Sequence, residues 1–105
     1  MPWLALLAAG LLEIVWAFAM KQSAGFTRPL PALLTLLAMI GSFGLLSLAM
    51  RTLPLGTAYT IWTGIGAVGA FVVGIVVLGE SVTPMRLAAA GLILGGLVMM
   101  KASAP

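Results

Sequence analysis

A single carboxylate, Glu13, lies in the middle of an apolar run from Trp3 to Met20. At about 1.5 Å of rise per residue, a helical run of this length nearly spans the ~30 Å hydrocarbon core of a bilayer. An ionisable side chain at that depth costs roughly 2.5 to 3.5 kcal/mol on insertion scales and marks a functional site by default. We therefore interpret Glu13 as a binding site for protons and cations. The alternative is a structural acid that hydrogen-bonds a neighbouring helix.

Aromatic and hydroxyl side chains could complete such a site. Trp16 follows Glu13 by three residues, so the two side chains share one helix face. An indole offers an N–H donor and a ring face that attracts cations. Tyr59 and Trp62 repeat this spacing in a later apolar segment, where aromatic packing or a membrane-surface belt is the alternative interpretation. Ser42, a hydroxyl in mid-membrane, is a candidate hydrogen-bond partner of the acid. The site lining predicted from the sequence is Trp16, Ser42, Tyr59 and Trp62.

The segments that must position these residues are strongly apolar. Of the 105 residues, 63% are hydrophobic and 7% are charged, and the mean hydropathy is +1.26. Such a chain lacks the polar surface of a water-soluble globule and is expected to be an integral membrane protein. Charge, proline and glycine divide it into four apolar segments connected by short loops. We predict a single all-α transmembrane domain over residues 1–105, with helices at about 3–20, 30–50, 55–78 and 85–100.

Composition excludes several classes of function. The chain has no cysteine and no histidine, so we expect no disulfide, no metal site and no cofactor. Its basic residues are scattered singly, which argues against a nucleic-acid partner. No second acid and no nucleophile with a base accompanies Glu13 in the apolar segments, so an enzyme is not expected.

The basic residues give little orientation bias. An even number of helices places both termini on one side of the membrane, with Arg51 and Lys101; the opposite side carries Lys21, Arg28 and Arg86. Because basic residues in short loops set orientation, two against three predicts insertion in both directions. Antiparallel homodimers then become possible.

Glycines suggest how the helices associate and move. Gly91 and Gly95 form a GxxxG pair in the last segment, which lets helix backbones approach closely, so we expect a dimer interface there. Gly64 and Gly66 weaken the third helix, which predicts either a hinge or a close helix contact.

Two copies of Glu13 in a dimer suggest a mechanism. Desolvation and mutual repulsion both disfavour the charged form of a paired, membrane-buried acid. Protons therefore compete with cations for the pair. If the site opens to each side of the membrane in turn, it can carry a cation in one direction and protons in the other. This exchange is proton-coupled antiport.

These residues, with two short motifs, resemble the small multidrug resistance family over essentially the whole chain. The motifs are Gly25-Phe26-Thr27-Arg28 in the first loop and Gly56-Thr57-Ala58-Tyr59, followed by Trp62, in the third helix. The resemblance implies an antiparallel, dual-topology homodimer in the bacterial inner membrane, with Glu13 as the shared proton and substrate site. It also implies that Gly64-Ile65-Gly66 bends to switch access.

The guanidinium-exporter branch of that family is similar to this chain at Trp16, Ser42, Glu80 and Lys101, whereas the polyaromatic-drug branch has glycine at the position of Trp16. We therefore expect export of guanidinium and small substituted guanidinium ions, whose planar N–H fork fits a carboxylate. The alternatives are a broader exporter of quaternary ammonium antiseptics and a non-transporting membrane assembly subunit.

The remaining charged residues are expected to lie outside the site. Glu80 and Arg86 are predicted to form a solvated surface pair, which would contribute only about 0 to 1 kcal/mol. Lys101 is expected to extend from its helix end to the lipid headgroups.

Overall fold

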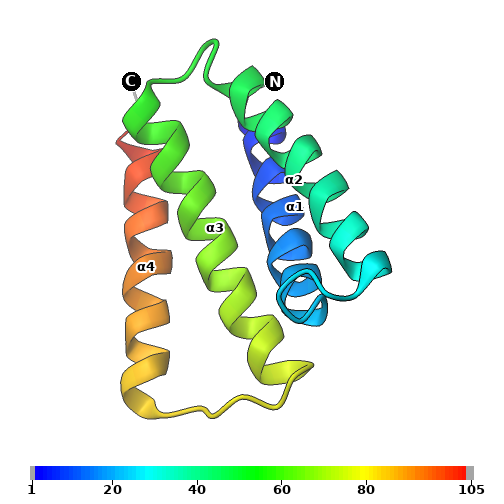
Figure 1. Ribbon diagram of the computed structural model, residues 1–105. Coiled ribbons are helices and arrows are strands. Elements are labelled where there is room, and N and C mark those ends of the chain that lie inside the picture. The colour runs from blue at the N-terminus through cyan, green and yellow to red at the C-terminus, as the bar shows by residue number, and fades with distance from the viewer. Residues whose placement is uncertain (1, 104–105) are drawn as a thin grey trace.

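The computed structural model describes residues 2–103 and contains four helices joined by short loops (Figure 1). All four are long and apolar enough to cross a membrane, which confirms the predicted all-α, four-span architecture. Compared with the sequence-based bounds, the first and last helices extend two residues further at their carboxyl ends and the third ends two residues earlier. The helices are α1 (Pro2–Gln22), α2 (Pro29–Ala49), α3 (Leu55–Val76) and α4 (Pro84–Ala102).

Proline marks the start of the last three helices. It occupies the first turn of α2 and of α4, and Pro54 is the residue before α3. Proline suits these positions because the first helical N–H groups have no intrahelical acceptor. Thr83 also caps α4, since its side-chain oxygen accepts a hydrogen bond from the backbone N–H of Arg86 at 3.1 Å.

The reversal between α1 and α2 is built around Ser23. Its hydroxyl donates to the carbonyl of Met20 (2.6 Å) and accepts from the backbone N–H of Phe26 (3.1 Å). Three consecutive residues, Ala24 to Phe26, have positive φ angles. This left-handed run turns the chain back within a few residues, so α2 returns along α1.

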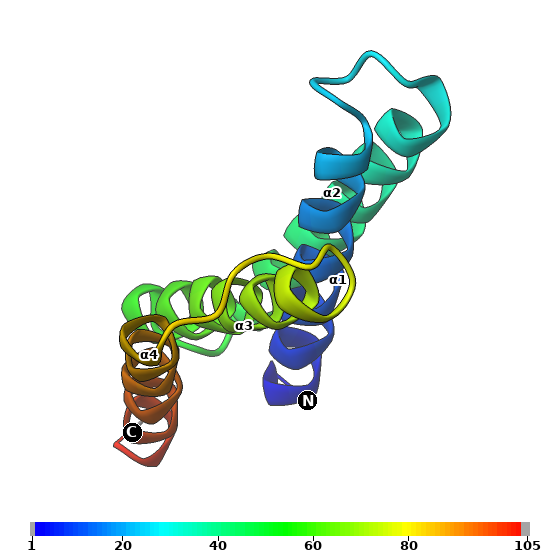
Figure 2. The same cartoon turned by 90° about the horizontal axis from the view of Figure 1, so that it is seen from below.

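The helices form a thin layer rather than a closed bundle. The backbone of α1 lies close to the backbones of α2 and α3, whereas the backbone of α4 lies close only to that of α3 among the described helices. Figure 2 shows the α1–α2 pair and the α3–α4 pair spread out on either side of the α1–α3 contact. The described chain measures 43 × 34 × 16 Å along its principal axes. A layer 16 Å through is little more than one helix diameter, so it does not enclose a path by itself.

A small apolar core lies where α1, α2 and α3 meet. Three of its seven buried residues are alanines, which let the helix backbones approach closely where lipid supplies no hydrophobic drive. The helix α4 contributes no buried residue. The buried core cluster is Leu6, Ala9, Leu46, Ala49, Ala58, Ile61 and Trp62.

Candidate functional site

Glu13 lies at the contact between α1 and α3. A Cβ atom added at Gly66 would collide with the Glu13 side chain, so the carboxylate occupies the space that this glycine leaves open. The Oε1 atom of Glu13 is buried and has no hydrogen-bond partner within residues 2–103. A buried carboxylate oxygen without a partner is costly. A proton or a bound cation would remove that cost.

Trp16 brings a second buried polar atom to the same helix face. Its Nε1 atom also has no hydrogen-bond partner in the described chain. Because Trp16 follows Glu13 by three residues, an acceptor and a donor lie about one turn apart along α1. These are the two buried side-chain polar atoms of residues 2–103 that lack a partner, and a polar ligand between them would satisfy both.

A row of aromatic rings extends from Trp16 across α2 to α3. Trp16 meets Phe43 edge to face, with centroids 6.3 Å apart, and Phe43 meets Trp62 in the same way at 5.8 Å. Tyr59 stands at the end of the row, 5.7 Å from Trp62, and is more than half exposed. The sequence-based site did not include Phe43. Phe43 is on α2 and Trp16 is on α1, so spacing within a single helix could not link the two residues.

Ser42 is buried, but it does not hydrogen-bond Glu13 as expected. Its hydroxyl donates to the carbonyl oxygen of Ala9 (2.6 Å) and accepts from Trp62 Nε1 (3.0 Å). Ala9 lies about one turn before Glu13 on α1, and this register puts the α1 backbone, rather than the carboxylate, within reach of the hydroxyl. Ser42 therefore ties α1, α2 and α3 together beside the acid.

Glycines of α3 lie under side chains of its neighbours. Gly64 makes room for Leu97 of α4 in the same way that Gly66 makes room for Glu13. The helix is continuous from Leu55 to Val76, so in this conformation the two glycines are close-packing points. A hinge motion at Gly64 and Gly66 would therefore also move or break their contacts with Leu97 and Glu13.

Gly91 and Gly95 face open space. Apart from the adjoining part of α4 itself, no atom of the described chain lies within 4 Å of a Cβ built at either position. The small-residue surface of α4 is therefore uncovered in the single chain and remains accessible to another helix.

The predicted surface pair between Glu80 and Arg86 is not formed in the described residues. The Glu80 carboxylate packs against Gly74, and Arg86 Nη1 donates to the hydroxyl of Ser81 at 3.3 Å. The backbone explains this: the Glu80 N–H donates to the Gly74 carbonyl (3.0 Å), which folds the residue back onto the end of α3.

The fold defines a small multi-pass membrane protein, with a carboxylate oxygen and an indole N–H buried without partners in the described part of its apolar layer. The family model described as "Small Multidrug Resistance protein" matches residues 1–93, and the chain belongs to this family. Its membership and its four membrane-spanning helices place it in the bacterial inner membrane.

Relatives are similar over nearly their whole length. The chain is 57% identical to a protein of Citrobacter freundii named "Guanidinium exporter" over 98% of both chains. It is 57% identical to one of the same name from Salmonella typhi over 99% of both chains, and 55% identical to that of Escherichia coli K12 over 98%. Exporters are transporters rather than enzymes, which agrees with the expectation that the chain is not an enzyme.

Proposed function

We propose that the chain exports guanidinium and small substituted guanidinium ions in exchange for protons, with Glu13 as the shared binding residue. The observation that carries the proposal is the Glu13 carboxylate, which is held in an apolar helix contact with one oxygen lacking any partner in the described chain. The names of the 55–57% identical relatives support guanidinium as the substrate.

The chemistry around Glu13 suits a small planar cation. Guanidinium presents N–H donors in a fixed fork that matches the two oxygens of a carboxylate. The aromatic faces of Trp16 and Trp62 attract cations, and Trp16 Nε1 helps to orient the carboxylate when it is charged. The ring of Phe43, which lies between the two tryptophans, narrows the space and disfavours bulky quaternary ammonium ions.

A second copy of the chain completes the site. A layer 16 Å thick cannot surround a cation with protein on all sides, whereas two layers face to face can. The near balance of two basic residues against three supports insertion in both directions, and hence an antiparallel pair. The open surface around Gly91 and Gly95 supports α4 as a contact between the copies.

Coupling follows from competition for the paired acids. The two Glu13 carboxylates can bind either a cation or protons, but not both at the same time. The site therefore carries one or the other when it opens to each side of the membrane. Gly64 and Gly66 are the proposed hinge of α3, because Leu97 and Glu13 rest on them. A bend there would move the wall of the site and its acid at once.

Transport by reconstituted protein tests the proposal. Purified wild type and Glu13→Gln are placed in liposomes, and guanidinium uptake and proton movement are recorded with a quaternary ammonium ion as competitor. Glu80→Gln is the matched control, because Glu80 is the only other acid of the chain and lies at the far end of α3. Guanidinium-driven proton movement should be lost in Glu13→Gln alone.

Three results would contradict parts of this proposal. Transport retained by Glu13→Gln would exclude the acid as the coupling residue. Strong inhibition by the quaternary ammonium ion, with transport of that ion, would indicate the broader antiseptic exporter. A well-folded wild type that moves neither ion would indicate the non-transporting assembly subunit.

A further inference from the structure

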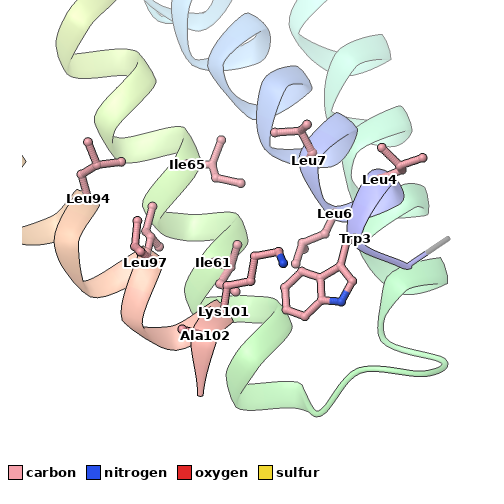
Figure 3. Close-up of a pocket in the computed structure, with 11 residues that line it drawn as sticks. Trp3, Leu4, Leu6, Leu7, Ile61, Ile65, Leu94, Leu97, Lys101 and Ala102 are labelled. Atoms are coloured by element: carbon pink, nitrogen blue, oxygen red, sulfur yellow. The ribbon is translucent and has the colours of Figure 1, made fainter. Parts of the chain in front are cut away.

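A large apolar groove lies between α1, α3 and α4, and Glu13 is not among the residues that line it. Its volume is about 560 Å³. Figure 3 shows aliphatic side chains of the three helices turned toward it. It follows α4 from Leu94 to Lys101, a rise of about 10 Å at 1.5 Å per residue. The residues that give it its apolar walls are Leu6, Leu7, Ile61, Ile65, Leu94 and Leu97.

One end of the groove carries a positive charge. Lys101 extends from the last turn of α4, and its Nζ atom lies 4.8 Å from the centre of the Trp3 ring (Figure 3). Tryptophan and lysine at helix ends mark the level of the lipid headgroups. The groove therefore begins at headgroup depth and continues into the hydrocarbon layer.

Neither acidic side chain of the sequence lies at this end. Glu80 packs against Gly74 near the carboxyl end of α3, which lies at the opposite end of the helices from the carboxyl end of α4 (Figure 1). Glu13 lies ten residues beyond Trp3 on α1, about 15 Å along the helix. The lysine at the mouth of the groove thus fits an anion from outside the chain.

We propose that this groove binds one acyl chain of an anionic phospholipid, with the lipid phosphate held by Lys101. An aliphatic channel with a cation at headgroup depth matches the two parts of such a lipid, a hydrocarbon tail and a negative phosphate. Trp3 forms the rim, and its ring holds the lysine in position. The lipid fills the gap between α1 and α4, whose backbones do not contact each other in the described chain.

Quenching of Trp3 fluorescence tests the site directly. The chain has three tryptophans, so the variant Trp16→Phe/Trp62→Phe leaves Trp3 as the only one. It is reconstituted into vesicles of phosphatidylcholine that contain a small fraction of tail-brominated phosphatidylglycerol or, in a parallel set, tail-brominated phosphatidylcholine. We expect the anionic quencher to act at several-fold lower mole fraction than the zwitterionic one.

One lysine variant and one arginine variant distinguish a specific lipid site from general attraction of anionic lipids to basic residues. Lys101→Gln should weaken the preference for the anionic lipid about fivefold, as expected for one basic residue near the membrane surface. Arg51→Gln is the matched control, because Arg51 lies on the same side of the membrane but borders a different pocket, with Pro2, Leu48 and Thr52. It should leave the preference unchanged. An equal loss in both variants would overturn the proposal.

A measurement on the unmodified protein covers the case in which the single-tryptophan variant fails to fold. Native mass spectrometry of the wild type in an equimolar mixture of the two lipids should show phosphatidylglycerol retained in preference, with the preference reduced in Lys101→Gln and not in Arg51→Gln. Equal retention of both lipids would overturn the site. Quenching of Trp3 by neither lipid would also overturn it and would indicate a second copy of the chain as the occupant.

Discussion

The Glu13 carboxylate of α1 occupies the space above Gly66 of α3, and any side chain at position 66 would collide with it. This contact puts the acid at the junction of two helices rather than on a free helix face. The position of the charge is therefore set by the glycine opposite it as much as by the acid's own helix.

Gly66→Ala tests that relationship. The added methyl group meets the far end of a flexible side chain, so the protein should still fold while the carboxylate is displaced. We expect guanidinium to bind at least about tenfold more weakly, equivalent to ~1.4 kcal/mol, as measured by titration of purified protein. Gly56→Ala, where nothing lies within 4 Å, should bind normally. Normal binding by Gly66→Ala would show that the contact does not set the position of the acid.

The hydrogen bonds of Ser42 make a second prediction. Ser42→Ala leaves the buried Trp62 N–H without an acceptor, and a lost interhelical hydrogen bond in a membrane protein costs about 1 kcal/mol. Thermal or denaturant unfolding in detergent should record this loss. Trp62→Phe removes the donor, so the double variant Ser42→Ala/Trp62→Phe should be less destabilised than the sum of the two single variants. Additive effects would contradict a direct bond.

The fold was largely predictable because each span is bounded by charge, proline or glycine and is apolar throughout. Glu13 could be identified as the candidate site for the same reason, since a lone acid in an apolar helix is conspicuous. Spacing along one helix also indicated Trp16 beside Glu13, and each of the two has a buried polar atom without a partner in the described chain.

Contacts between different helices could not be predicted from the amino-acid sequence alone. The register of α2 against α1 decides that Ser42 reaches the Ala9 carbonyl rather than Glu13, and no spacing within α2 encodes that register. The same register places Phe43 between Trp16 and Trp62, which spacing within one helix could not predict. Glu80 was wrongly paired with Arg86 because a turn at the end of α3 redirects it toward Gly74.

The uncovered face of α4 leads to a third prediction. Gly91→Leu/Gly95→Leu adds bulk where the described chain has open space, so the single chain should fold unchanged. If helix backbones approach closely there, dimers should be reduced at least about tenfold, a change of ~1.4 kcal/mol. Energy transfer between labelled copies in liposomes measures this. Gly56→Leu is the control for bulk at another open position, and equal dimerisation in all three proteins would place the interface elsewhere.

The balance of basic residues gives a fourth prediction. Arg51→Ala/Lys101→Ala leaves three basic residues, all on the side of Lys21, Arg28 and Arg86, whereas Lys21→Ala/Arg28→Ala/Arg86→Ala leaves only Arg51 and Lys101, on the other side. Because the side with more basic residues stays in the cytoplasm, each variant should insert in one orientation, the two being opposite. In an antiparallel dimer, neither variant alone can supply both partners. Cells that express either one should therefore lose guanidinium resistance, and cells that express both should regain it. Full resistance from one oriented variant would mean that the working unit needs only one orientation.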